Sequence, residues 1–384
     1  MRHSSSPRLQ QPYPAQAAQG TPHSHNVPEL REHHADTNEG KTMKLTLVSI
    51  GINSHMDMSL KGVEAARNAN SVYAEMYTMK IDTTLSELEE LVGKPITPLP
   101  RGGMEEKGTE LINEAKEKDV VVLVGGDALS ATTHISLLLD ARQEGVKTDV
   151  IHGSSIFTSI TDTGLSIYKF GKTVTIPFPE KGPVDSVLRT LHENHEYGNH
   201  TLMLLDLNMA EDRYLSINDA IRRLFETDKF PRDSLLIGVA RLGSRFPTIK
   251  ADTAEVLSRY DFGESPHALI APGKLHFLEQ DALVELARCP RGVVEAHKVQ
   301  GEVDRLIAKY TKGCKKVLDE LKNRELPATI TEDQVREMLE HIERYLDDAE
   351  YYWGEQKAVA LTSVAYAEGI LDALKLLGLV EFEW

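Results

Sequence analysis

Cysteine, long apolar runs and positive charge are all scarce in this 384-residue sequence. The two cysteines, Cys289 and Cys314, are too few for a disulfide framework, and no histidine accompanies them at zinc-ligand spacing. No run approaches the ~20 consecutive apolar residues that a membrane span requires. We therefore expect a soluble, cytoplasmic protein with no structural metal and no membrane partner.

Lysine and arginine together number 43, against 59 aspartates and glutamates, which gives a formal net charge of −16. Such a balance repels phosphate backbones, so we expect no bulk nucleic-acid binding. Hydrophobic residues make up 41% of the chain, enough for at least one sizeable core, and the length favours two or three domains.

Several catalytic motifs are also missing. The chain has no HExxH zinc motif and no EF-hand loop, and no Ser-His-Asp arrangement can be assembled from it. The turn Ser49–Asn53 contains only Gly51 where a dinucleotide fingerprint needs three glycines, and no lysine follows Gly125 and Gly126 as a P-loop requires. Metal-dependent and nucleophilic catalysis therefore have no support in the sequence.

Residues 1–42 differ in composition from the rest of the chain. They are rich in Pro, Gln, Ser and His and have almost no aliphatic periodicity, so they cannot bury enough apolar surface to fold. We predict a disordered tail. A start codon placed too far upstream, with translation beginning at Met43, explains the same stretch equally well.

Beyond Met43, apolar runs typical of strands alternate with amphipathic segments typical of helices, which indicates crossover connections and an α/β fold. The run within Asp119–Val124 predicts a strand buried on both faces of a mostly parallel sheet. The expected strands are Lys44–Ile50, Val72–Tyr77, Lys94–Leu99, Asp119–Val124, Asp149–His152, Thr173–Pro177, Thr201–Leu207, Leu235–Arg241 and Ala268–Ala271. The expected helices are Ser59–Ala69, Thr84–Val92, Met104–Lys116, Ala131–Glu144, Val184–His195, Ser216–Phe225 and Ala254–Tyr260.

From about Glu302 the strand pattern ends and three helices are expected, over Val303–Leu321, Thr331–Tyr352 and Gln356–Leu377. Thr331 and Gln334 have capping-box spacing. One face of the last helix carries a regular apolar stripe, made of Ala360, Val364, Ala367, Leu371 and Leu374. The chain thus divides into a tail (1–42), an N-terminal α/β lobe (43–165), a C-terminal α/β lobe (166–294) and an all-α helical appendage (302–384).

Three loops of the N-terminal lobe follow strand ends, where open α/β sheets bind ligands. They are Ser49–Asn53, Gly125–His134 and Ile151–Ile156. Each also has a plain structural interpretation: a turn at Gly51, a helix cap at Asp127, and an N-cap at Ser154 or Ser155.

In the C-terminal lobe, Leu205–Asp206, Gly238–Ser244 and Ser265–His276 are similar strand ends. His267 and His276 are either acid–base groups near neutral pH or hydrogen-bonded structural groups. Two α/β lobes in succession leave a cleft between them, and small-molecule sites commonly form in such clefts.

A series of short motifs gives the region from Met43 to about Val294 a specific resemblance to the diphthine synthase family, within the tetrapyrrole methylase superfamily. The motifs are Ser59–Gly62, Ala74–Thr78, Gly126–Asp127, Ala131–His134, Thr163–Leu165, Tyr168–Lys172, His200–Leu202, Leu205–Asp206, Ala240–Ser244, Asp261–Gly263 and Pro272–His276. Their agreement in order along both lobes is far more specific than any one of them.

The resemblance implies two α/β lobes that hold S-adenosylmethionine between them, in a homodimer. By matching positions, it implies cofactor contacts at Ile52, Asp127, Ser130, Ser155, Ile156, Leu205, Ala240 and His267. The first loop, Ser49–Ile52, replaces the family's common Gly-Leu-Gly-Leu, and Ala128 replaces the proline of its Gly-Asp-Pro. Backbone contacts tolerate such changes.

The resemblance also implies a substrate: translation elongation factor 2, in which a histidine bears a 3-carboxy-3-aminopropyl group whose amine takes the methyl in diphthamide biosynthesis. Such an amine has a pKa of roughly 8, so a useful fraction is neutral near pH 7. Alignment of the reactants can supply roughly 7–11 kcal/mol of the barrier. We therefore assign no catalytic residue.

Two other functions stay open at this point. One is a methylase of the same fold that acts on a tetrapyrrole or on ribosomal RNA. The other is a catalytically silent interaction module in which the altered first loop has lost the cofactor.

The last helices resemble a small archaeal helical family of unknown function, through Tyr345–Ala349 and Ala365–Leu374. No activity follows from that resemblance. A lysine cluster in this region is either a contact for RNA or an acidic partner, or a solvated helix face. It consists of Lys309, Lys312, Lys315 and Lys316.

Overall fold

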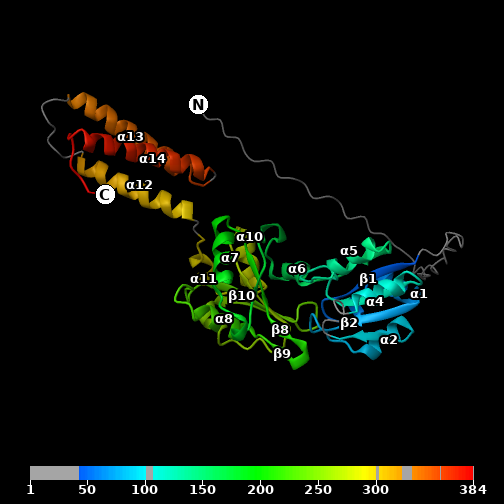
Figure 1. Ribbon diagram of the computed structural model, residues 1–384. Helices are drawn as coiled ribbons and strands as arrows, with labels where there is room; N and C mark the ends of the chain where they lie inside the picture. Colours follow the sequence, from blue (N-terminus) through cyan, green and yellow to red (C-terminus); the bar gives the residue numbers. More distant parts are fainter. Residues whose placement is uncertain (1–42, 101–106, 300–301, 322–330, 355, 384) are drawn as a thin grey trace, which may run out of the picture. The chain divides into compact units, whose positions relative to one another are not determined.

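The structure, a computed structural model, describes residues 43–100, 107–299, 302–354 except 322–330, and 356–383 (Figure 1). The tail expected over residues 1–42 and the start of the expected helix at Met104 lie outside these residues.

A five-stranded, wholly parallel sheet forms the first α/β region, in the strand order β3-β2-β4-β1-β5. Its strands are β1 (Lys44–Gly51), β2 (Ser71–Glu75), β3 (Thr97–Leu99), β4 (Val120–Gly125) and β5 (Lys147–Ile151). Its helices are η1 (His55–Asp57), α1 (Leu60–Asn68), α2 (Leu85–Val92), α4 (Gly108–Ala115) and α5 (Ile135–Gln143). The prediction of a parallel α/β region is confirmed.

Strand β4 shows why this sheet forms. All six of its residues are buried, and they alternate between two cores. Val120, Val122 and Val124 pack with the apolar residues of α4 and α5, whereas Val121 and Leu123 pack with those of α1 and α2. A strand covered on both faces needs apolar side chains at every position, as the sequence predicts.

The second sheet also has five strands, in the order β11-β10-β12-β7-β6, but only β6 and β7 pair in parallel. Its strands are β6 (Val174–Ile176), β7 (Thr201–Leu205), β10 (Leu235–Ala240), β11 (Thr248–Thr253) and β12 (His267–Ala271), and a separate hairpin joins β8 (Leu207–Asn208) to β9 (Arg213–Tyr214). The neighbouring helices are α6 (Ile156–Ser159), η2 (Ile160–Thr163), η3 (Ile167–Lys169), η4 (Pro179–Lys181), α7 (Asp185–Glu196), η5 (Met209–Glu211), α8 (Ile217–Phe225), α9 (Ala254–Leu257), α10 (Phe277–Glu285) and α11 (Arg291–Ala296).

Two expected helices differ from those observed. Helix α5 begins at Ile135 rather than at Ala131, because Ala131 has a left-handed backbone with φ 58° and cannot continue a right-handed helix. The helix expected over Ala254–Tyr260 ends at Leu257. Strand β11, the β8–β9 hairpin and helices α10 and α11 were not expected from the sequence.

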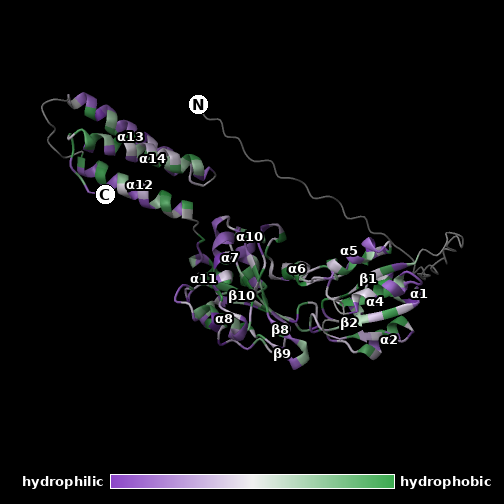
Figure 2. Cartoon of the chain, viewed as in Figure 1, coloured by the Kyte–Doolittle hydropathy of each residue, from purple (hydrophilic) through white to green (hydrophobic). Residues whose placement is uncertain are grey.

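Three helices follow, as predicted: α12 (Glu302–Leu321), α13 (Glu332–Tyr352) and α14 (Lys357–Leu376). Figure 2 shows that hydrophilic and hydrophobic residues are mixed along each of them, as amphipathic helices require. The apolar stripe of α14 is buried in a core that these helices share with the C-terminal segment up to Phe382. The predicted capping box at Thr331 and Gln334 is present.

The lysine cluster of α12 is at least partly neutralised within this helical unit. Lys315 pairs with Glu350, and Lys316 lies 3.8 Å from Glu320. These pairs favour the interpretation of a solvated helix face. Among the described helices, none combines the length and the apolar character needed to cross a membrane.

Candidate cofactor-binding site

A cavity of about 350 Å³ collects most of the predicted cofactor residues. It is lined by the loops that follow β1, β2, β4 and β5 and by residues of β7, β10 and β12. Seven of the eight predicted residues line it: Ile52, Asp127, Ser130, Ser155, Ile156, Leu205 and His267. A larger cavity, of about 960 Å³, lies against α7 and α11 and contains none of them.

Ala240 is the predicted residue that does not line the cavity. Its side chain is fully buried in the core of the second sheet, and its chain neighbours Val239 and Arg241 line the cavity instead. Ala240 lies opposite His267 in the pairing of β10 with β12. The structure therefore does not bring the Ala240 side chain to the cavity, because successive residues of a strand point to opposite faces of the sheet.

Asp127 links two of the loops at the centre of the site. One carboxylate oxygen accepts hydrogen bonds from the Leu129 amide and the Ser130 hydroxyl, both at 3.1 Å. The other accepts from the Gly153 amide at 3.2 Å and lies 2.9 Å from Nδ1 of His152. Asp127 is therefore not the cap of α5 but a bridge between the loops after β4 and β5.

These bonds also keep Asp127 ionised. Burial alone would raise the pKa of this carboxyl, but the hydrogen bonds from His152, from the amides of Leu129 and Gly153 and from Ser130 together lower it below its usual value. A nearly buried carboxylate that carries a charge can accept hydrogen bonds from a bound ligand.

Hydrogen bonds from backbone amides fix the first loop to the other two. The amide of Gly51 donates to the carbonyl of Gly126 at 3.1 Å, and the amide of Gly126 donates back at 2.9 Å. The Ile52 amide donates to the hydroxyl of Ser154 at 3.0 Å. Gly51 has a φ of 105°, and a Cβ there would lie 2.3 Å from Cβ of Asp57, so this one glycine is required by conformation and by space.

Sequence reasoning gave no role to Glu75, which lies beneath the loop after β2. Its side chain is fully buried and accepts hydrogen bonds from the amides of Tyr77 and Thr78, at 2.6 and 2.9 Å, and from the Thr78 hydroxyl at 2.8 Å. Nε2 of His134 lies 3.7 Å away. Glu75 thereby shapes the segment that brings Thr78 and Met79 to the cavity. Its presence in the Ala74–Thr78 motif was the available signal.

Of the described residues, the titratable ones that line the cavity are Asp127, Asp206, Arg241 and His267. Asp206 accepts hydrogen bonds from the Phe178 amide and from Lys181. Arg241 donates to the carbonyls of Phe262 and Glu264 and to the Thr248 hydroxyl. Both of these side chains are thus already hydrogen-bonded to other groups of the protein.

Both ring nitrogens of His267 also have partners within the protein. Its Nε2 lies 3.2 Å from the carbonyl of Gly263, and its Nδ1 accepts from the Ile217 amide at 3.4 Å. Burial is the main reason that the pKa of His267 is lowered. His276, the other candidate, accepts from the Leu278 amide at 3.4 Å as the N-cap of α10. The geometry favours the structural role for both histidines.

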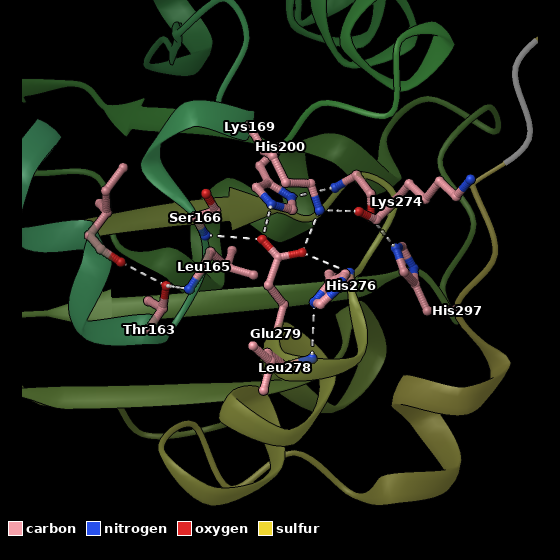
Figure 3. Close-up of polar contacts among 12 residues, drawn as sticks. Thr163, Leu165, Ser166, Lys169, His200, Lys274, His276, Leu278, Glu279 and His297 are labelled. Atoms are coloured by element: carbon pink, nitrogen blue, oxygen red, sulfur yellow. Dashed lines mark hydrogen bonds and ion pairs between the residues drawn. The ribbon is translucent and has the colours of Figure 1, made fainter. Parts of the chain in front are cut away.

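A second polar cluster is built around Glu279 (Figure 3), and none of its residues lines the cavity. The carboxylate accepts from the amides of Ser166 and His276, at 3.0 and 2.8 Å, and from Lys169, and it lies 3.1 Å from Nε2 of His200. These bonds lower the pKa of Glu279 to about 2, although burial acts to raise it. The cluster holds three of the family motifs together and was not predicted from the sequence.

Comparison with known proteins agrees with this architecture. The family model described as Tetrapyrrole (Corrin/Porphyrin) Methylases matches residues 44–257, and that described as Protein of unknown function (DUF357) matches residues 309–380. The diphthine synthase of Methanosarcina acetivorans is 39% identical over an alignment of 264 residues that covers 65% of this chain and 98% of that protein. The diphthine synthase of Methanocaldococcus jannaschii is 39% identical over an alignment of 249 residues that covers 62% of this chain and 97% of that protein.

Solved structures show the same relationship. A crystal structure of diphthine synthase has a TM-score of 0.62 at 38% identity and covers 66% of this chain and 99% of its own. A putative diphthine synthase from Entamoeba histolytica has a TM-score of 0.58 at 28% identity and covers 64% and 98%. The chain belongs to the tetrapyrrole methylase family, in its diphthine synthase branch, with a helical DUF357 domain fused after it.

Proposed function

We propose that this chain methylates the amino group of the 3-carboxy-3-aminopropyl-modified histidine of elongation factor 2, which yields diphthine in diphthamide biosynthesis. Membership of the family makes the chain an S-adenosylmethionine-dependent methyltransferase. The observation that carries the choice of substrate is the match to diphthine synthases at 39% identity over 98% of their length.

The residues of the cavity fit S-adenosylmethionine. Its volume of about 350 Å³ falls within the ~300–1,000 Å³ that is usual for small-molecule sites. Asp127 offers an ionised carboxylate to the polar groups of the donor. The apolar side chains of Ile52, Ile156 and Leu205 form the remaining surface, as a partly desolvated site for a sulfonium requires.

Bound S-adenosylmethionine supplies a methyl group on a positively charged sulfur. We infer that the protein acts mainly by holding the two reactants in line, because all four titratable side chains that line the cavity are already hydrogen-bonded. The acceptor amine reacts in its neutral form, because only that form has a free lone pair to attack the methyl group. Alignment can account for roughly 7–11 kcal/mol of such a barrier.

The proposal extends to the organisation of the protein. We infer an archaeal, cytoplasmic homodimer without a bound metal, in which residues 43–165 and 166–294 form the two lobes of the methyltransferase and residues 302–384 the helical domain. The same assignment makes Ile52, Asp127, Ser130, Ser155, Ile156, Leu205, Ala240 and His267 the cofactor contacts. The intact cavity and the ionised Asp127 support an enzyme rather than a silent interaction module.

The test is incubation of the full chain with isotope-labelled S-adenosylmethionine and elongation factor 2 that carries the unmethylated precursor. Mass spectrometry should find label on the modified histidine. The mass increase gives the number of methyl groups added. A factor that already carries diphthine is the matched control and should take up none. Label on a tetrapyrrole or on ribosomal RNA, with none on the factor, would replace this proposal by the corresponding methylase.

A further inference from the structure

Lys80 lies beside the cofactor cavity, at the point where the two sheets contribute to it. It directly follows Met79, which lines the cavity from the loop after β2. Its Nζ is 5.0 Å from the centre of the Tyr214 ring in β9, and Tyr214 pairs with Leu207 of β8, which lines the cavity from the β8–β9 hairpin. A cation over an aromatic face is held in place without losing its charge.

The other cations around this part of the cavity have partners in the protein. Arg241 is bound to the Phe262 and Glu264 carbonyls, Lys181 is paired with Asp206, and Arg213 is paired with Glu180. Within the described part of the chain, Lys80 has no ion-pair partner. Its ammonium is therefore the cation beside this cavity that is free to bind a carboxylate.

The charge of Lys80 affects the pKa of His267, a residue that lines the cavity. Burial is the largest cause of the lowered pKa of His267, but the charges of Arg241 and Lys80 also lower it. Since His267 lines the cavity, a carboxylate beside this histidine would also lie within reach of the field of Lys80.

We propose that Lys80 binds the carboxylate of the 3-carboxy-3-aminopropyl group of the acceptor histidine. This inference rests on the proposed function. In that group the carboxylate and the reacting amine are attached to the same carbon, so an ion pair with Lys80 holds the amine two bonds from the anchored carboxyl carbon. The remaining rotation is all that is needed to direct the amine at the methyl donor.

S-adenosylmethionine also carries a carboxylate, so the test must distinguish the two sources. Its affinity is measured by calorimetry, and kcat and KM are measured with elongation factor 2 that carries the precursor. Lys80→Gln should raise the KM for the factor by about 10- to 100-fold, as expected for the loss of a charged hydrogen bond. Its affinity for S-adenosylmethionine should stay within about twofold of the wild type, and Lys80→Arg should recover most of the loss.

Two further variants separate recognition from a merely structural role. Lys61→Gln removes an exposed lysine of α1 and should change neither constant. Tyr214→Leu removes the aromatic ring but leaves the charge, and should raise the KM for the factor less than Lys80→Gln does. An equal rise would show that the β8–β9 hairpin is responsible and would overturn the proposal.

The remaining outcomes are also decisive. Lower affinity of Lys80→Gln for S-adenosylmethionine would assign the lysine to the donor's carboxylate and overturn the proposal. A wild-type protein that methylates the precursor beside a Lys80→Gln variant with unchanged KM would overturn the role of Lys80 alone. A wild-type protein that leaves the precursor unmethylated would overturn the proposed function and this inference together.

Discussion

Nδ1 of His152 lies 2.9 Å from a carboxylate oxygen of Asp127, and the two side chains differ sharply in exposure, 66% for the histidine against 8% for the aspartate. The ring of His152 thus covers a carboxylate that is otherwise enclosed by the loops after β4 and β5. The pair joins one strand end of the first sheet to another, at a carboxylate that lines the cavity.

Replacement of Asp127 tests the centre of the site. Asp127→Ala removes a carboxylate that accepts hydrogen bonds from Leu129, Ser130 and Gly153 and is in contact with His152. A hydrogen bond to a charged group contributes about 1.5–3 kcal/mol, so we expect S-adenosylmethionine binding to be abolished while the fold persists. Calorimetry and circular dichroism measure the two effects. His152→Ala loses one of these contacts and should weaken binding less; unchanged affinity of Asp127→Ala would refute the assignment.

A pair of glycine variants tests the first loop. Both Gly51 and Gly93 have a positive φ, but a Cβ at Gly51 would lie 2.3 Å from Asp57, whereas one at Gly93 would meet nothing within 4 Å. Gly93→Ala should therefore cost only the backbone strain of about 1–2 kcal/mol. Gly51→Ala should in addition displace the loop and weaken S-adenosylmethionine binding at least tenfold, measured by calorimetry. Similar binding by the two variants would mean that this loop does not contact the donor.

The buried cluster around Glu279 predicts a specific loss of stability in acid. The pKa of Glu279 is lowered from 4.5 to about 2, so its ionised form stabilises the folded state above pH 4.5, and this contribution is lost as the pH falls from about 4.5 toward 2. The shift corresponds to roughly 3 kcal/mol. Urea unfolding of the wild type and Glu279→Gln should differ most near neutral pH, and the difference should shrink below pH 4.5. A constant difference would exclude this carboxylate as the titrating group.

Helix α14 offers a matched pair for the helical domain. Leu371 is fully buried, whereas Leu376 in the same helix is 87% exposed. Leu371→Ala should destabilise the helical domain by about 2–5 kcal/mol, and Leu376→Ala by less than about 0.5 kcal/mol. Thermal unfolding measures both. Because the core of these helices contains no residue of the two sheets, neither variant should change the affinity for S-adenosylmethionine; a loss in Leu371→Ala would show that the two parts are coupled.

The sequence predicts the elements whose burial follows from the local pattern of apolar residues alone. The continuous valines of β4 and the stripe of α14 require the same burial in any arrangement of the chain, and both are found. Strand β11 was missed because its sequence, TIKADT, mixes charged and apolar residues. It becomes a strand only through antiparallel pairing with β10.

The candidate site likewise has parts that the local sequence predicts and parts that it does not. The loops after β1, β4 and β5 could be located, since strand ends of one parallel sheet meet at one edge. The left-handed backbone of Ala131 could not be predicted, because it is imposed by the folded loop and not by the residue type. Glu279 accepts a hydrogen bond from the amide of Ser166, 113 residues away in the sequence, and no local pattern specifies such a partner. No local pattern marks Lys80 either, because its significance depends on which neighbouring cations are already paired.

The reciprocal bonds between Gly51 and Gly126 have a mechanical consequence. Neither loop can swing outward alone, because each glycine holds the other by both its donor and its acceptor. The two loops should therefore move together beside the cavity, and the protons on these two amides should exchange with deuterated solvent at a single shared rate.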